Sequence, residues 1–457
     1  MRRSALAAPL VLPLVMLASA CGTEESEGNN GPDPSPSPAA GWEAREASHG
    51  AALPRLVVSA ADSGAVHVID VASGETAGSV EATGPALLSA ASPSGGQVFL
   101  VQTGDDTVQL LDAGIRYTAH GDHADPDHVE PALVEGAIEV PEPSHALVHG
   151  DHAAVFADGD GSVSLVNVGD EAPDELAAEA TTPSGTAHQG VAIPLGHDIV
   201  ASRADSSGEV TGVQVLTEDG DVEAEFDDCP DLRGAFAPDS ETALFGCSDG
   251  VLKVHSHDGT WEATKIDAPE GGGEDARVTM LAGAPGAEQV LGSYSDGQVA
   301  VIDTAAEEIS PLDLPADFVT LAWDPFWEQG LVLTSDGSLH AVDPANGEIT
   351  HSTRATGEVG DATEDGGRAA VVAGENYAYV VNPTTRELAE VSVGGDGLAL
   401  ERAMTLDFTP RDLAIVGLAE LGGHEEHEHT HEEGHDHSAD SGEGHDHAHD
   451  EEHDHAH

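Results

Sequence analysis

The sequence predicts an all-β fold, a β-propeller of eight blades with seven as the alternative, over residues 53–421. Short segments alternate apolar and polar positions and are bounded by Gly, Asp, Asn or Pro, as strands and turns are. They recur at roughly 40 to 45 residues with about four strands per unit, and a repeat of this size is typical of a β-propeller. No segment has the periodicity of an amphipathic helix.

One strand pattern shows the repeat most clearly. It is a short apolar strand that ends at Asp or His, with a following Gly-Glu turn in two copies, and it occurs at residues 66–75, 249–255, 297–303 and 336–348. Inner strands, which line the channel of a propeller, are expected near residues 86, 144, 188, 233, 278, 318, 360 and 411. The expected strand near 360 is weak, which leaves seven blades open.

The two ends of this region are expected to complete one blade together. The strand at residues 412–416 has no outer strands after it, and the strand at 56–59 has no inner strand before it. Pairing between them would close the ring and remove the free edges that an open array would leave.

The charge balance limits the possible partners. Among 457 residues there are 85 acidic and 15 basic side chains, which give a formal net charge of −70. Such a chain repels nucleic acid and anionic membrane surfaces, and it attracts cations. Adaptation to high salt would explain the acidic residues, but it would not explain the 26 His.

The N-terminus has the features of a targeting segment. Residues 1–20 begin with a basic start and continue as an apolar run too short to span a membrane comfortably, so they are expected to be a lipoprotein signal peptide. A small-residue stretch before Cys21 resembles a bacterial lipobox, which predicts lipidation of Cys21. An ordinary signal peptide cleaved after Ala20 is the alternative. Residues 21–52 are expected to be a flexible linker, so the protein would be extracytoplasmic and would touch the membrane only through its lipid anchor.

Two cysteines remain if Cys21 carries lipid. Cys229 and Cys247 lie near strand ends of one repeat unit. Because the expected compartment is oxidising, a disulfide between them is the preferred interpretation, and a metal-binding cysteine pair is the lesser one.

The C-terminal residues 422–457 contain twelve His and many Asp and Glu, without Lys or Arg. This composition predicts a disordered tail, and tracts of this kind bind zinc, copper or nickel. A solvated tail or an expression tag is the alternative. Low-affinity metal ligands are expected at His435, His437, His445, His447, His453 and His455.

A second metal-ligand candidate lies within the propeller region. Residues 120–128 hold three imidazoles and three carboxylates, and the segment is expected to be a loop. Imidazole and carboxylate are zinc ligands, and zinc takes three or four of them. A polar surface loop in an acidic chain is the alternative. The candidate ligands are His120, Asp122, His123 and His128.

Two further histidines are expected at the starts of neighbouring inner strands. His145 and His188 would meet at one mouth of the channel, where the loop at 120–128 could fold over them and complete a site of three or four ligands. A hydrogen-bonded structural role is the alternative for each of the two alone. Asp158 is expected in a turn, where it could orient a ligand. Other histidines are expected in structural positions or at a solvated turn: His67, His149, His152, His255 and His340.

No nucleophile motif or phosphate-binding loop occurs, so the protein is not expected to be an enzyme. Two alternative functions are kept. One is a metal-dependent propeller hydrolase of the lactonase kind, which would need a metal-bound water beside a carboxylate base. The other is a surface propeller whose tail only buffers metal.

Several unusual segments, taken in order, resemble the AztD family of extracytoplasmic zinc chaperones. They are Tyr117-x-x-His-Gly-Asp-His123, Pro143-Ser-His145, Phe156-x-Asp-Gly-Asp-Gly-Ser162, His188-x-Gly-Val191, Cys229-Pro-x-Leu232 and Phe245-Gly-Cys-x-Asp-Gly250. The resemblance implies a zinc-binding β-propeller that hands Zn²⁺ directly to the solute-binding protein of a zinc ABC importer. By position it implies His120, His123, His145 and His188 as ligands. We expect a monomer that binds no nucleic acid.

The chain departs from the family pattern at two places. The segment after His123 lacks a further expected His and aromatic residues, and Arg233 stands where a His is expected. A lost ligand would mean a weaker site, or one completed by Asp127 or His128. The acidic His-rich tail is an addition to the family pattern.

Overall fold

The computed structural model describes residues 41–44, 54–91, 95–120, 123–169, 172–183, 185–269 and 276–418. Side chains at 117–126 are not among the described features. The expected signal peptide at 1–20, the lipidation site Cys21 and the tail at 422–457 lie outside this part of the chain. Within the described ranges, no helix has the length and apolar character that a membrane span requires.

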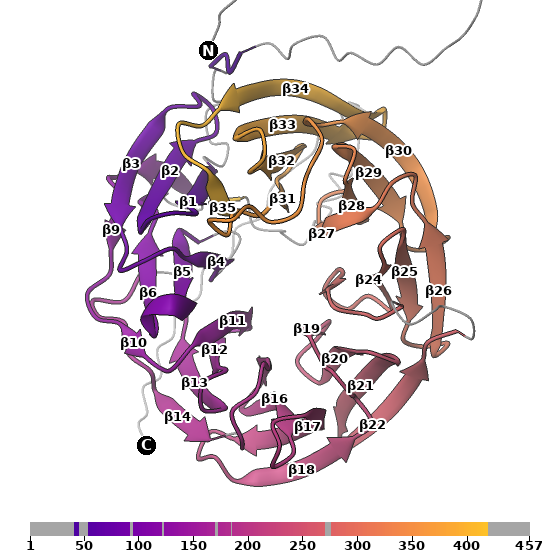
Figure 1. Cartoon of the computed structure of the whole chain (residues 1–457). Coiled ribbons are helices and arrows are strands. Elements are labelled where there is room, and N and C mark those ends of the chain that lie inside the picture. The colour runs from indigo at the N-terminus through magenta and orange to yellow at the C-terminus, as the bar shows by residue number, and fades with distance from the viewer. Residues whose placement is uncertain are drawn as a thin grey trace, which may run out of the picture.

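Eight β-sheets stand around a central channel, which confirms the predicted all-β propeller with eight blades (Figure 1). From the channel outward, the first four blades are β35 (Pro410–Val416), β1 (Arg55–Ala60), β2 (Ala65–Asp70) and β3 (Thr76–Glu81); β4 (Leu87–Ala90), β5 (Gln97–Gln102) and β6 (Thr107–Asp112), with a split outer strand β9 (Ala132–Leu133) and β10 (Ile138–Glu139); β11 (Pro143–His149), β12 (His152–Ala157), β13 (Ser162–Asn167) and β14 (Ala180–Pro183); and β15 (Ala192–Leu195), β16 (Asp198–Ala204), β17 (Val210–Thr217) and β18 (Val222–Asp227).

The other four blades each have four strands in chain order. They are β19 (Gly234–Phe236), β20 (Thr242–Cys247), β21 (Gly250–His257) and β22 (Thr260–Asp267); β23 (Leu281–Ala282), β24 (Gln289–Ser295), β25 (Gln298–Asp303) and β26 (Glu308–Asp313); β27 (Phe318–Asp324), β28 (Gln329–Thr334), β29 (Ser338–Asp343) and β30 (Glu348–Arg354); and β31 (Ala370–Ala373), β32 (Tyr377–Asn382), β33 (Glu387–Gly394) and β34 (Gly397–Thr405). The helical content of the described residues is one 3₁₀ turn, η1 (Thr103–Asp105).

The ring closes as expected from the sequence. The C-terminal strand β35 pairs with the N-terminal strand β1, and the register joins Arg55 to Val416 and Val57 to Ala414. The inner strand of this blade therefore comes from one end of the chain and its three outer strands come from the other. This pairing satisfies the edge that each terminal segment would otherwise expose.

Three inner strands begin later than expected. The strand expected near 188 is β15, which begins at Ala192, and the strand expected near 278 is β23, which begins at Leu281. The weak strand near 360 is in fact a loop, and β31 begins at Ala370. In that loop the amide of Gly360 donates to the hydroxyl of Thr384, so its backbone bonds to a side chain instead of a strand.

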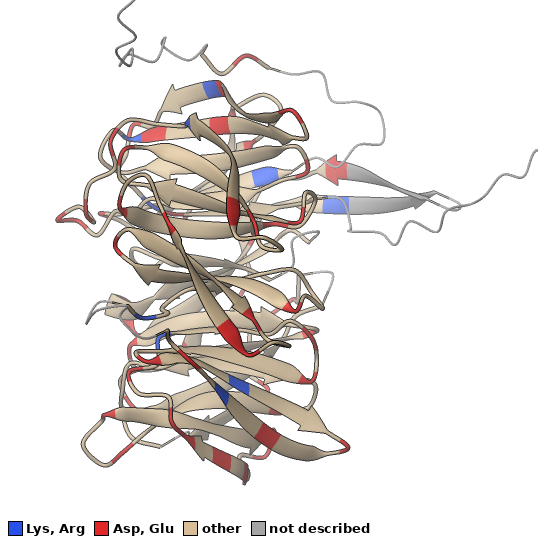
Figure 2. Ribbon diagram, turned by 90° about the vertical axis from the view of Figure 1, so that its right-hand side faces the viewer, with Lys and Arg blue, Asp and Glu red and all other residues tan. Residues whose placement is uncertain are grey.

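The predicted loop at 120–128 is also different in the structure. Its backbone forms a β-hairpin of β7 (Ile115–His120) and β8 (His123–His128), paired from Ile115↔His128 to His120↔His123. The hairpin is inserted after β6, and its two base ends leave one face of the ring (Figure 2). The loop prediction was wrong because a two-stranded ribbon outside the core needs no apolar alternation.

Packing between neighbouring blades forms the core. The second strand of each blade is covered on both faces, and in β1 every residue is buried. The outer strand β3 instead has exposed residues among partly buried ones. Small aliphatic residues fill most of this space, and the largest fully buried side chains are Tyr294, Tyr379, Phe99, Phe156 and Phe245. Burying an aliphatic or aromatic side chain of this kind contributes about 1.5–3 kcal/mol.

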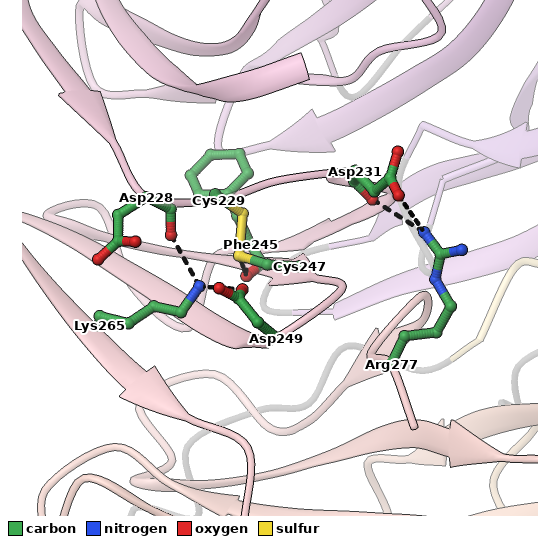
Figure 3. The surroundings of a disulfide bond; sticks show 8 residues. All are labelled: Asp228, Cys229, Asp231, Phe245, Cys247, Asp249, Lys265 and Arg277. Atoms are coloured by element: carbon green, nitrogen blue, oxygen red, sulfur yellow. Dashed lines mark hydrogen bonds and ion pairs between the residues drawn. A yellow bond between two sulfur atoms is a disulfide. The ribbon is translucent and has the colours of Figure 1, made fainter. Parts of the chain in front are cut away.

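The predicted disulfide is present. Cys229 and Cys247 are joined, with their Cα atoms 5.0 Å apart, and both are fully buried. The bond ties the segment before β19 to the end of β20 (Figure 3). Beside it, the ammonium of Lys265 on the outer strand β22 donates to the carbonyl of Asp228 at 2.7 Å, which fixes the same segment from the outside of the blade.

A short piece of the expected linker contacts the propeller. The indole nitrogen of Trp42 donates to the carbonyl of Val71 at 3.3 Å, and the guanidinium of Arg402 lies 4.4 Å from the Trp42 ring centroid. Arg402 also donates to the carbonyl of Glu43 at 2.7 Å and to the buried carboxylate of Glu390 at 2.9 Å. These contacts join the last blade of the chain to the blade that closes the ring.

Candidate metal centre

The base of the hairpin β7–β8 is held by a buried arginine of β1. The Arg55 guanidinium donates to the carbonyl of Ala113, to that of Gly114 at 3.2 Å and to that of Val129 at 2.9 Å. These three carbonyls flank the two ends of the hairpin. Arg55 is 4% exposed, and burial lowers its pKa, although nearby carboxylates oppose this effect. The hairpin is thus anchored to the rigid part of the blade.

An imidazole–carboxylate pair forms the second anchor. His128 Nδ1 lies 3.3 Å from Asp70 Oδ2, and Asp70 also accepts from the amide and hydroxyl of Ser73. The bond to His128, helped by those to Ser73, lowers the pKa of Asp70 to about 2. In this arrangement Asp70 orients the His128 ring, as carboxylates commonly do for histidine ligands of metals.

The register of the hairpin shows which of the candidate ligands share a face of the ribbon. His120 is directly opposite His123, and Thr118 is directly opposite Asp125, two positions along the same strands. His128 is opposite Ile115, at a position of the other parity. Cross-strand positions of one parity share a face of the ribbon. Asp122 lies outside the described residues.

His145 is the third residue of β11 and lies at a channel mouth. It lines a cavity of about 550 Å³, formed by the first residues of several inner strands. Burial lowers the pKa of His145, Asp158 opposes this shift and Arg368 adds to it. The neutral ring that results has a lone pair available, but the nearby arginine disfavours a divalent cation.

His188 is buried four residues before β15. Its Nδ1 donates to the carbonyl of Thr186 at 2.6 Å, and the hydroxyl of Ser202 donates to Nε2 at 2.8 Å. The carbonyl oxygen of Thr186 can only accept, so Nδ1 carries the proton and Nε2 accepts from Ser202. The ring also meets the edge of Phe156, with centroids 5.0 Å apart. Both ring nitrogens are therefore engaged in this structure, and a metal would have to displace Ser202.

Asp158 connects the surroundings of the two channel histidines. Its Oδ1 accepts from the hydroxyl of Ser144 at 2.7 Å and from the amide of Gly190 at 3.1 Å. Ser144 precedes His145, and Gly190 follows His188 by two residues. Asp158 therefore positions both backbone segments from its turn after β12.

The structure does not bring the hairpin and the channel histidines together. The starts of the inner strands share one mouth, since the amide of Leu88 donates to Asp412 at 2.9 Å and both residues line the cavity with His145. The hairpin is anchored by Arg55, which pairs with Val416 at the far end of β35. A strand of seven residues is about 20 Å long, whereas zinc binds its ligands at about 2 Å.

The strand directions and the hairpin register therefore favour two separate clusters over the expected single site. Among the described side chains, no group of three or more His, Cys, Asp or Glu is arranged to hold a metal ion. The hairpin side chains at 117–126 are outside that set. The remaining candidates within the propeller divide into a hairpin cluster, with His120, His123 and His128, and a mouth pair, His145 and His188.

The other histidines have local partners. His67 stacks on Phe408 with centroids 4.2 Å apart, and His340 Nε2 lies 3.0 Å from the hydroxyl of Thr334. His149 and His152 are paired at the turn between β11 and β12, where His152 Nδ1 lies 2.8 Å from Asp151. His255 Nε2 lies 3.8 Å from the carboxylate of Glu262.

Sequence reasoning did not identify Asp70 or Arg55 as part of this region. Asp70 bonds to a hairpin residue and Arg55 to residues that flank the hairpin, all far along the chain, and no local motif signals such a pairing. Strand counting could have revealed the separation of the two clusters. Successive strands of a blade alternate in direction, so an insertion after the third strand lies at the end opposite to the start of the first.

Fold and site together define an eight-bladed β-propeller with a histidine-bearing hairpin on one face and a channel cavity opening at the other. The chain is similar to the zinc chaperone AztD of Citrobacter koseri, with 27% identity over 388 residues, 83% of this chain and 90% of the relative. The predicted resemblance to AztD is thereby confirmed. The relative is named as a chaperone and not as an enzyme, in agreement with the expectation from the sequence. No protein-family model matches the chain.

Solved structures support the same fold. An apo structure of Citrobacter koseri AztD has a TM-score of 0.70 at 23% identity, and it covers 80% of this chain and 99% of that one. A second AztD structure from the same organism has a TM-score of 0.71 at 23% identity, with 80% and 98% covered. Saccharomyces cerevisiae Sqt1 matches more distantly, with a TM-score of 0.50 at 14% identity over 80% of this chain and 99% of that one.

Proposed function

We propose that this protein is an extracytoplasmic zinc metallochaperone that captures Zn²⁺ and transfers it to the solute-binding protein of a zinc ABC importer. The similarity to a protein named as a zinc chaperone, over most of both chains, supports this function. The observation that carries it is the anchored hairpin, whose register sets His120 directly opposite His123. The proposed cargo is Zn²⁺, and the protein acts as a monomer.

The hairpin supplies the proposed zinc ligands. His120 and His123 are opposed across the strands, and Asp125 follows His123 by two positions on β8, at the same parity. Two imidazoles and a carboxylate are a common zinc donor set, and Asp122, which stands between His120 and His123 in the sequence, would be a fourth ligand. His128 is at the other parity and holds the hairpin base through Asp70. The pair His145 and His188 is kept as a second, separate candidate site.

A site on a projecting hairpin suits transfer. Zn²⁺ has no geometric preference from its d-electrons, so a ligand of the acceptor can replace a ligand of the donor step by step. A closed site within a core would have to open first. In this proposal the tail histidines, among them His435, His437, His445, His447, His453 and His455, capture metal weakly and raise its local concentration near the hairpin. The lipid on Cys21 keeps the protein at the membrane that holds the importer.

A zinc competition titration of the full chain tests the assignment. The tail would mask the result, so all variants carry Ser in place of the twelve tail histidines. In that background we expect one tight equivalent of zinc, lost in His120→Ala/His123→Ala. The matched control is His149→Ala/His152→Ala, which removes two paired histidines at another turn and should keep the tight site. Tight binding that survives the hairpin change but disappears with His145→Ala would move the site to the channel mouth.

A further inference from the structure

The cavity at the channel mouth contains an unusual concentration of positive charge. The chain has 15 basic residues against 85 acidic ones, and two of the arginines, Arg368 and Arg411, line this one cavity of about 550 Å³. The loop before β31 carries Arg368, and β35 carries Arg411, so the fold brings together residues of neighbouring blades. In a protein with a formal charge of −70, two clustered arginines at a channel mouth require an explanation.

Arg411 has both a like charge and a carboxylate near it, Arg368 and Asp412. After burial, the largest influence on the pKa of Arg411 is the repulsion from Arg368, which lowers it, and Asp412 opposes this less strongly. Arg411 donates weakly to the carbonyl of Gly366 at 3.4 Å, and its buried Nε has no hydrogen-bond partner within the described structure. Repulsion of this kind is relieved when an anion binds between the two groups.

Asp412 attracts both arginines but forms no ion pair with either of them among the described contacts. Asp412 Oδ2 accepts from the amide of Leu88 at 2.9 Å, and its Oδ1 accepts from its neighbour Leu413 at 2.8 Å. Both of its oxygens are thus used by the backbone. Asp361 also lines the cavity but is exposed to solvent, and no ion pair joins it to either arginine among the described contacts. Donors therefore remain available on both arginines.

We propose that this cavity binds a small organic carboxylate between Arg368 and Arg411. The planar guanidinium fork matches the two oxygens of a carboxylate. Apolar side chains form much of the remaining wall, including Leu87, Met280 and Val319, and they suit a carbon skeleton better than an inorganic anion. The volume lies within the range of small-molecule sites. This site is separate from the hairpin, and His145 of the second candidate zinc site lines the same cavity.

Two sources of the same carboxylate chemistry are available: a free organic acid and the acidic tail of the chain itself. Isothermal titration of the full chain with succinate, in metal-free buffer without carboxylate chelators and at constant ionic strength, tests the first source. A synthetic peptide of residues 434–457 tests the second. We expect saturable one-to-one succinate binding that is weakened about tenfold in Arg368→Gln and in Arg411→Gln, and abolished in the double variant.

Control variants keep the test decisive. Arg354→Gln removes an exposed arginine at the end of the outer strand β30 and should leave succinate affinity unchanged. Arg368→Lys/Arg411→Lys keeps both charges, so it should fold like the parent and bind succinate with intermediate affinity. Arginine-dependent binding of the peptide alone would support the proposal with the tail as the source. The proposal would be overturned if succinate and the peptide bound the parent, the Lys variant and the Gln variants equally well. It would also be overturned if neither probe bound the parent.

Discussion

The anchor between Asp70 and His128 makes a quantitative prediction for Asp70→Asn. The pKa of Asp70 in the folded protein is about 2, against an ordinary value of 3.8. That difference corresponds to about 2.4 kcal/mol as an upper bound, since each pH unit is worth about 1.4 kcal/mol. The side chains of Asp70 and His128 are 23% and 19% exposed, so solvent screens part of the interaction. We therefore expect Asp70→Asn to lower the free energy of unfolding by about 1–2 kcal/mol at pH 6.

The pH dependence follows from the sign of the shift. Folding lowers the pKa of Asp70, so its stabilisation is complete above the unfolded-state value of 3.8 and is lost as the pH falls through about 2. At pH 3 the difference between parent and variant should therefore shrink to about half of its value at pH 6. Urea unfolding at both pH values measures it.

Asp62→Asn is the matched control, because Asp62 is an exposed aspartate in the turn between β1 and β2. It should change the free energy of unfolding by less than about 0.5 kcal/mol. Hydrogen exchange of the β7–β8 amides adds a local readout, and exchange should be faster in Asp70→Asn. Equal stability of parent and Asp70→Asn at pH 6, with unchanged exchange in the hairpin, would refute the anchoring role.

Three further changes test the fold around the site. Arg402→Met should lower the free energy of unfolding by about 3–5 kcal/mol because it leaves the fully buried Glu390 charge without this partner; Arg402→Met/Glu390→Leu should recover most of that loss, and an equally unstable double variant would argue against a charge effect. Cys229→Ser/Cys247→Ser should cost about 2–4 kcal/mol in urea unfolding, and reductant should destabilise the parent but not this variant. His188→Ala should cost about 1–3 kcal/mol because Ser202 and Thr186 lose their buried partner, and a thermal midpoint equal to that of the parent would contradict the hydrogen bonds assigned to the ring.

Most of the fold could be predicted from the sequence because each blade repeats one strand pattern. Closure by β35 and β1 followed from counting: one end of the region had an inner strand without outer strands, and the other had the reverse. The inner strand near 360 was misplaced because the pattern there is weak and the loop up to Ala370 is long. Loop residues that bond to side chains, such as Gly360, give no periodic signal.

The candidate site was less predictable. The chemistry of the segment at 120–128 was visible in its composition, but its strand pairing was not, because a ribbon outside the core needs no apolar face. The assignment of His128 to the base of the hairpin depends on register and on Asp70, which lies in another blade. Arg368 and Arg411 line one cavity because the ring brings the loop before β31 and the start of β35 to the same mouth of the channel.

Direct zinc transfer is the central claim, and its kinetics test it most directly. The zinc-loaded protein with Ser in place of its tail histidines is mixed with the metal-free solute-binding protein of the importer, and loading of that acceptor is followed by stopped flow. A strong chelator, in a parallel experiment, gives the rate of free zinc dissociation. The account predicts acceptor loading that rises with acceptor concentration and exceeds the dissociation rate, and that is lost in His120→Ala/His123→Ala. Loading no faster than free dissociation would contradict it.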